Sequence, residues 1–163
     1  MTGWWDEIVA NFSDLPSFEF VIRLAVRLSI AALLGGAVGS QREWSGKSAG
    51  LRTHMLVALG SALFVVVPQQ AGVSSSDLSR IIQGVISGMG FLGAGAILKP
   101  SDANEVKGLT TAAGLWLTCA IGIAVGLGRL ASAVLGTLLA LLILTAVHRV
   151  SAWLEERKGG GLK

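Results

Sequence analysis

Eight polar side chains near two Gly-Leu steps have the chemistry to bind an anion. The steps are Gly50-Leu51 and Gly108-Leu109, and each directly precedes an apolar stretch. A helix that begins there presents unpaired backbone amides and the positive end of its dipole, which favour an anion, and nearby basic side chains strengthen that preference. The candidate site for a phosphate, a lipid headgroup or a partner's carboxylate comprises Arg42, Glu43, Arg52, Thr53, Lys99, Lys107, Thr110 and Thr111.

The same charges have a second explanation that needs no ligand. Short cytoplasmic loops of membrane proteins carry an excess of Lys and Arg. Local acidic partners are also at hand, since Glu43, Asp102 and Glu105 lie among the basic residues. The sequence alone leaves both explanations open.

Cation and catalytic chemistry find less support in the sequence. Magnesium prefers oxygen ligands, commonly one or two carboxylates, and carboxylates within membrane spans mark cation and proton routes. No Asp or Glu lies in the middle of an apolar stretch, and we expect His54 at a membrane interface and Cys119 in a packed interior. The chain also lacks the patterns of zinc proteases, nucleophile elbows and phosphate-binding loops. We therefore predict no metal site, no cofactor and no enzymatic activity.

The elements that position these residues are predicted to be transmembrane helices. Apolar residues make up 52% of the 163 residues and charged residues 14%, against about 25% charged in soluble domains. Five apolar stretches have the ~20-residue length of a membrane span, at roughly 18–39, 52–71, 79–98, 108–127 and 130–149. The predicted fold is all-α, a polytopic transmembrane bundle of five helices, with an external interfacial arm at 1–17, a transmembrane domain at 18–150 and a cytoplasmic tail at 151–163.

Basic residues predict the orientation, because they gather in cytoplasmic loops. Arg80 and Arg129 fall on one side. Arg23 and Arg27 lie in the outer part of the first span, where they either snorkel toward that same side, with Glu19 as a partner for Arg23, or belong to a functional pathway. The opposite side has Arg42, Lys47, Arg52, Lys99, Lys107, Arg149, Arg157, Lys158 and Lys163. We expect a multi-pass membrane protein with its amino terminus outside and its carboxyl terminus in the cytoplasm.

Small residues at four-residue spacing predict close helix packing, since they let backbones approach within a membrane. The packing glycines are predicted to be Gly35, Gly39, Gly84, Gly88, Gly114, Gly122 and Gly126. The third stretch also holds Gly90, Gly93 and Gly95, and glycine weakens a helix by up to about 1 kcal/mol relative to alanine. A local break in that helix is therefore an alternative to a continuous one.

An offset of 58 residues aligns the first two spans with the next two. It places Leu34-Gly35 on Leu92-Gly93 and Gly50-Leu51 on Gly108-Leu109. The spans would then form a parallel two-helix repeat, although chance matches are expected in a chain so rich in glycine and leucine. Repeats of this kind are common in transporter folds, but a repeat does not itself imply transport.

Four motifs in order give the chain a family resemblance. They are Gly39-Ser40-Gln41-Arg42-Glu43, the Gly-Leu-Arg-Thr-His run from Gly50, the glycine-rich third span, and Gly-Leu-Thr-Thr-Ala-Ala from Gly108. Over roughly residues 20–150 the chain resembles the MgtC/SapB family of bacterial membrane proteins. The resemblance implies an inner-membrane protein associated with adaptation to low magnesium. Some members are labelled magnesium transporters, and others are similar to regulators of membrane proteins such as the ATP synthase.

Departures from the family pattern limit what carries over. Members often have Glu where this chain has Gln41 and Asn where it has Thr110, and many have a soluble carboxyl-terminal domain, whereas this chain ends shortly after the fifth stretch. The leading hypothesis is a noncatalytic protein that modulates other membrane proteins under magnesium limitation or acid stress. The alternatives are a magnesium, ion or small-solute transporter and a structural homo-oligomer. The expected partners are the lipid bilayer, a membrane protein such as ATP synthase, or a second copy, and no nucleic acid.

Overall fold

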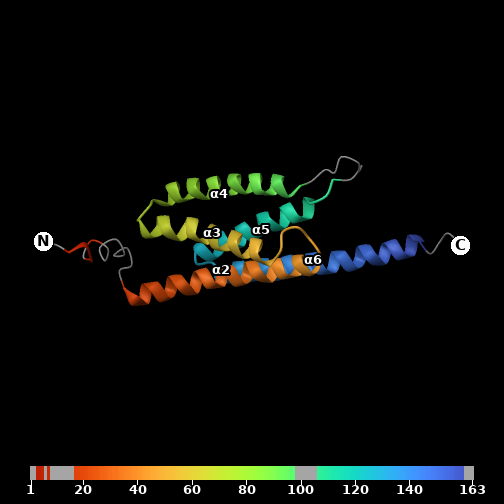
Figure 1. The fold of residues 1–163 in the computed structure, drawn as a ribbon, viewed down its shortest axis with the longest axis horizontal. Helices are drawn as coiled ribbons and strands as arrows, with labels where there is room; N and C mark the ends of the chain where they lie inside the picture. The colour runs from red at the N-terminus through yellow and green to blue at the C-terminus, as the bar shows by residue number, and fades with distance from the viewer. Residues whose placement is uncertain (1–2, 6, 8–16, 98–105, 160–163) are drawn as a thin grey trace.

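The computed structural model describes residues 3–5, 7, 17–97 and 106–159, and most of these are helical. The long helices over this part of the chain are α2 (Phe18–Trp44), α3 (Leu51–Gln70), α4 (Ser75–Ala96), α5 (Leu109–Gly126) and α6 (Leu130–Gly159). They lie side by side with their axes roughly along the long direction of the molecule (Figure 1). The predicted all-α bundle of five helices is confirmed.

Local signals set where two of the helices begin and where α2 ends. The hydroxyl of Ser17 accepts the Phe20 N–H at 3.2 Å at the start of α2, and Ser74 accepts the Asp77 N–H at 3.2 Å at the start of α4. Such caps satisfy amides that have no partner within the helix. The first span was predicted to end at 39, but α2 continues to Trp44 because charged residues at a membrane boundary do not end a helix. The chain turns just after it, at Gly46 with φ of 65°.

The glycine-rich α4 is continuous. Its backbone is helical through Gly90, Gly93 and Gly95 as far as Ala96. The break that the sequence offered as an alternative is therefore not found within Ser75–Ala96. Glycine has a low intrinsic helix propensity, so the packing of α4 against α5 and α3 stabilises this helix.

The core of the bundle is made by α2, α3 and α5. Glycines on α2 and α5 meet the backbone of α3 from two sides. A Cβ atom at Gly35 would lie 2.5 Å from the His54 carbonyl oxygen, and one at Gly126 would lie 2.8 Å from the Ala62 carbonyl oxygen. Gly39 and Gly122 face α3 just as closely. Backbone contact of this kind is available only where the side chain is a hydrogen atom.

Gly84 and Gly88 lie in different surroundings. Both are exposed, and a Cβ atom at either position would have no heavy atom of another element within 4 Å. Gly114 is buried, and its Cβ position lies at an ordinary van der Waals distance, 3.5 Å, from the His54 ring. Among the described residues, therefore, Gly84 and Gly88 bring no helices together and instead leave space beside α4.

Two pairs of contacts follow the 58-residue offset of the sequence. Gly35 faces His54, and the equivalent Gly93 faces Ala112, 3.7 Å from its Cβ position. Gly39 approaches Gly50, and the equivalent Ile97 approaches Gly108, with 3.1 Å from the Gly108 Cβ position to the Ile97 Cα. These matched contacts support the proposed two-helix repeat, with α2 and α3 as one unit and α4 and α5 as the other.

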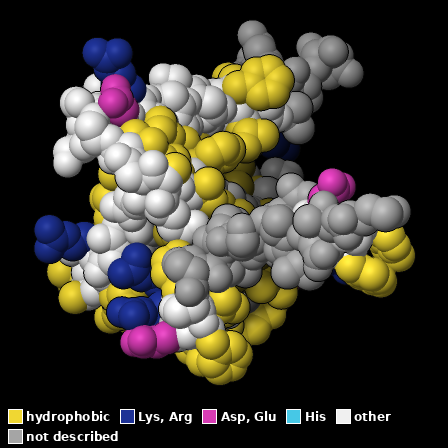
Figure 2. All heavy atoms as spheres, turned by 90° about the vertical axis from the view of Figure 1, so that its left-hand side faces the viewer, with side chains coloured by type: hydrophobic (Ala, Val, Ile, Leu, Met, Phe, Trp, Pro, Cys, Tyr) yellow, Lys and Arg dark blue, Asp and Glu magenta, His cyan; other side chains and the backbone are white. Residues whose placement is uncertain are grey.

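The surface of the bundle suits a lipid environment. Helices α2, α3 and α5 are long and apolar enough to cross a membrane, with mean hydropathies of 1.9, 1.6 and 1.7, and α6 contributes a shorter apolar segment, Leu130–Ala146. Large apolar side chains such as Phe64, Phe91 and Leu142 are exposed. Figure 2 shows charged side chains near the edge of one end of the molecule with hydrophobic surface between them. The chain is a helical membrane protein, and crossing by α4 and α6 and the orientation of the termini stay predictions.

The predicted outer end of the bundle carries one of the expected ion pairs. Arg23 Nη2 donates to Glu19 Oε1 at 2.9 Å, four residues earlier on α2. The external arm at 1–17 lies mostly outside the described residues, as does the end of the tail at 160–163. Within the arm, Trp4 and Trp5 are exposed, and their ring centroids stand 4.3 Å apart.

Candidate functional site

The predicted anion site is divided by the structure into a buried part and an exposed part. The buried part joins Arg42 of α2 to Thr111 of α5, through a hydrogen bond of 3.3 Å from Arg42 Nη2 to Thr111 Oγ1. Each of these residues is only 3% exposed. This pair therefore ties two core helices together near one end of the bundle.

Glu43 closes the turn between α2 and α3. Its Oε2 accepts the backbone N–H of Leu51 at 2.8 Å, which supplies the cap that Gly50 has no side chain to provide. A Cβ atom at Gly50 would lie 2.6 Å from that same oxygen, so glycine at this position lets the carboxylate approach. One oxygen of Glu43 is thus committed to the fold and the other is not.

Arg52 and Thr53 form the exposed part of the site. They stand in the first turn of α3 and line a polar hollow of about 460 Å³ together with Glu43, Lys47 and Ser48. Among the described side chains, no carboxylate lies within ion-pair distance of Arg52 or Lys47. The hollow therefore holds two basic groups against one carboxylate that is already engaged.

The remaining predicted residues do not line this hollow. Lys107 and Thr110 are exposed where α5 begins, and neither is among the residues of the hollow. Lys99 lies outside the described residues. The structure thus joins Arg42 with Thr111 and places Glu43, Arg52 and Thr53 around one hollow.

A buried histidine is the main feature that the sequence interpretation missed. His54 was expected at an interface, and that expectation is wrong, because the residue is fully buried between α2 and α5. Its Nδ1 is 2.7 Å from the hydroxyl of Thr118. The Thr118 hydroxyl donates its proton to the Gly114 carbonyl oxygen at 2.9 Å, so His54 Nδ1 is the donor in the shorter bond. Glycines at 35, 39 and 114 make room for the ring.

Three buried polar atoms of α2 and α3 have no hydrogen-bond partner among the described residues. They are Gln41 Oε1, Arg42 Nε and His54 Nε2. Arg42 lies close enough to His54 for the two side chains to interact electrostatically. We call Arg42, His54, Thr111 and Thr118 the buried polar cluster, whereas the Gln41 amide donates to the Leu144 carbonyl oxygen of α6. Arg42 Nε is a donor, whereas Gln41 Oε1 and, with Nδ1 donating, His54 Nε2 of a neutral ring are acceptors. This mixture of donor and acceptors suits ordered water, and the buried guanidinium disfavours a cation.

The described residues offer no alternative centre for a metal ion. Over these ranges, no group of three or more His, Cys, Asp or Glu side chains comes together. The single cysteine, Cys119, is buried and free, as the sequence predicted. The chemistry of this chain is thus concentrated in the buried polar cluster and the exposed hollow.

The family of the chain follows from comparison with known sequences. The sequence model of the MgtC family matches residues 28–153, which include both the cluster and the hollow. The chain belongs to the MgtC family. The resemblance drawn from the four motifs is therefore confirmed. No solved structure matches the chain.

Similar proteins differ in how much of their length this chain covers. Protein SrpB of Synechococcus elongatus is 46% identical over 159 residues, which cover 90% of this chain and 87% of SrpB. "Putative magnesium transporter YhiD" of Escherichia coli K12 is 43% identical over 82% of this chain and 62% of its own. Protein MgtC of Salmonella typhimurium LT2 is 39% identical over 76% of this chain and 50% of its own. The match with this chain therefore covers most of SrpB but only about half to two thirds of YhiD and MgtC.

Proposed function

We propose that this chain is a noncatalytic inner-membrane protein that serves adaptation to magnesium limitation or acid stress by modulating other membrane proteins. Membership of the MgtC family supports the link to magnesium, as does the name of the YhiD relative. The mode of action is argued from the polar residues of the core. Modulation of another membrane protein does not require that the chain itself transports magnesium.

The observation that carries the proposal is the makeup of the buried polar residues. In the described part of the chain these are Arg42, His54, Ser61, Thr111, Thr118 and Thr137, and none is a carboxylate. A magnesium ion entering the core would meet a guanidinium in place of the carboxylate oxygens that it prefers. Close backbone packing through Gly35 and Gly122 leaves no wide path beside them. A link to magnesium is therefore better explained by action on another protein.

The exposed basic residues are the proposed contact for that protein. Arg52 and Lys107 are both exposed, at the starts of α3 and α5. Charges of this kind steer a partner and select it by complementarity more than they add raw affinity. We propose an acidic cytoplasmic segment of a membrane protein as the partner, with the ATP synthase as the first to test.

Charge removal at these two positions should weaken partner binding. We expect Arg52→Gln combined with Lys107→Gln to slow association with purified ATP synthase in nanodiscs by at least about tenfold at low salt, since electrostatic steering raises association rates by about 10–10³. Binding is measured by surface plasmon resonance at low and physiological salt. Arg80→Gln is the matched control, because Arg80 is also exposed but lies on α4, near the end of the bundle where α3 ends (Figure 1). Equal binding by all variants, or no binding by the unaltered chain, would remove this partner from the account.

Transport remains the second candidate, and the buried polar cluster indicates which kind. Arg42 is buried with a free Nε donor, which favours an anion over magnesium as a transported species. The matched contacts of the two-helix repeat are also typical of transporter folds. Under this alternative, the chain would move an anion or a small acidic solute through the region of Arg42.

A further inference from the structure

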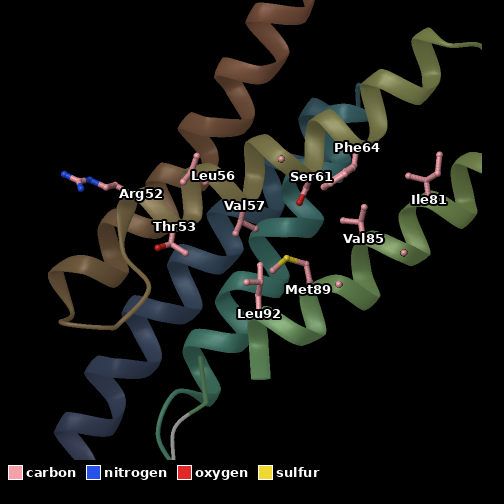
Figure 3. A pocket seen from close by; sticks show the side chains of 13 residues that line it. Arg52, Thr53, Leu56, Val57, Ser61, Phe64, Ile81, Val85, Met89 and Leu92 are labelled. Atoms are coloured by element: carbon pink, nitrogen blue, oxygen red, sulfur yellow. The ribbon is translucent and has the colours of Figure 1, made fainter. Parts of the chain in front are cut away.

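An apolar groove runs between α3 and α4 on the outside of the bundle. It has a volume of about 710 Å³ and is walled by apolar side chains that include Leu56 and Phe64 of α3 and Val85 and Met89 of α4 (Figure 3). Gly84 and Gly88 keep it open, since they have no side chain and a Cβ atom at either position would lie in open space, with nothing within 4 Å. Volumes of this size are typical of ligand sites.

The groove must be filled when the protein lies in a bilayer. Empty apolar space forfeits dispersion contacts, and water does not enter a site with few polar partners. Acyl chains are the surrounding solvent of this face, so a lipid tail is its default occupant. Because lipid tails are as apolar as the groove itself, burial of a tail provides little selectivity. Selectivity for one lipid must come from the polar end of the groove.

That polar end is the hollow at the start of α3. Arg52 and Thr53 line both the apolar groove and the polar hollow, so the two spaces adjoin at these residues. Figure 3 shows Arg52 extending away from α4, beyond the end of the groove. Lys47 and Glu43 complete the hollow, and one Glu43 oxygen is occupied by the Leu51 N–H. An amphiphile whose tail follows the groove would place its polar group beside these charges.

We propose that the groove and the hollow together bind one anionic glycerophospholipid of the phosphatidylglycerol class. One acyl chain lies between α3 and α4, and Arg52 and Lys47 contact the phosphate. The headgroup hydroxyls donate to the uncommitted oxygen of Glu43. Basic pockets between transmembrane helices bind anionic headgroups in this way. Arg52 also belongs to the proposed partner contact, whereas Lys107 is part of neither space, so Lys47, the groove and Lys107 allow the lipid and the protein partner to be tested separately.

Native mass spectrometry of the full chain, released from micelles with added lipid, tests the headgroup. We expect phosphatidylglycerol to bind more tightly than phosphatidylcholine with the same acyl chains. Arg52→Gln combined with Lys47→Gln should weaken phosphatidylglycerol binding about thirtyfold, from about 1 kcal/mol for each basic residue. Lys107→Gln is the control and should leave lipid binding unchanged, whether or not it affects ATP synthase. Equal binding of the two lipids by the unaltered chain would overturn the proposal.

Filling the groove tests the tail. Gly88→Leu places a side chain in open space, so the variant should fold with an unchanged thermal midpoint while binding of both lipids falls severalfold. Soluble glycerophosphoglycerol should not displace the lipid. Lipid binding that withstands Gly88→Leu, or displacement by the soluble headgroup, would show that the tail is not held there. A shift of oligomeric state in Gly88→Leu without loss of lipid would assign the groove to a second copy and overturn the proposal.

Discussion

Gly122→Ala should lower the free energy of unfolding by about 1–3 kcal/mol, the usual cost of adding a methyl group to a packed interior. A Cβ atom at Gly122 would collide with the Ala58 carbonyl oxygen and lie 2.8 Å from the Ser61 Cβ, so α5 would have to move off α3. Neither obstacle is a flexible side-chain end. The measurement is unfolding of the purified chain in mixed detergent micelles, with increasing SDS as denaturant.

Gly84→Ala is the matched control for this prediction. Gly84 is also a helical glycine at four-residue spacing from another, but its Cβ position has nothing within 4 Å. Alanine there should leave stability unchanged or raise it by up to about 1 kcal/mol, because it favours the helix. Equal losses for Gly122→Ala and Gly84→Ala would contradict the arrangement of α3 between α2 and α5.

Thr118→Val should also destabilise the bundle, by about 1–3 kcal/mol. Valine preserves the shape of threonine but removes the hydroxyl that accepts from His54 Nδ1 at 2.7 Å. The histidine is fully buried, so its donor would be left without a partner, and that desolvation cost is the expected loss. The same SDS titration measures it.

Thr145→Val is the control for Thr118→Val. It removes a threonine hydroxyl from a helix without taking a hydrogen-bond partner from His54. Thr145 is exposed, and its hydroxyl bonds to the Leu141 carbonyl oxygen at 2.6 Å, as the Thr118 hydroxyl bonds to Gly114. Surface substitutions of this kind usually change stability by no more than about 0.5 kcal/mol. A loss at Thr118 no larger than that at Thr145 would mean that the histidine does not depend on the hydroxyl.

The helices of this protein were predictable because their apolar stretches are long and because local signals mark the starts of α2 and α4 and the turn after α2. The positions of Ser17, Gly46 and Ser74 relative to the apolar runs are visible in the sequence. Boundaries differed by a few residues where side chains at the membrane edge could belong to a helix or a loop, as at Arg42 and Glu43. Hydropathy marks where the apolar residues end, and α2 continues past that point through charged residues as far as Trp44.

Which glycines pack could not be predicted from spacing. Gly84 and Gly88 have the same four-residue spacing as Gly122 and Gly126, yet only the second pair meets another backbone. Spacing defines a face of one helix but does not say which helix lies against it. That choice depends on how all the helices fit together, and a single sequence carries little information about it.

The buried polar cluster was only partly visible in the sequence. Gly35, Gly39 and Arg42 follow one another at four and three residues, so Arg42 shares the face of α2 that packs on α3. Likewise His54 heads the small-residue stripe of α3 that continues through Ala58 and Ala62. These periodicities could have indicated that both residues are buried. The bond between His54 and Thr118 joins residues 64 apart in the chain, and no local pattern predicts it.

Flux into liposomes tests whether the chain itself transports magnesium or acts only by modulating other membrane proteins. The purified full chain is reconstituted alone, and Mg²⁺ and H⁺ entry are followed with trapped fluorescent indicators over a range of external concentrations. The account predicts entry no faster than into protein-free liposomes, because the described buried polar residues include Arg42 and no carboxylate. Robust, saturable Mg²⁺ flux carried by this chain alone would contradict it.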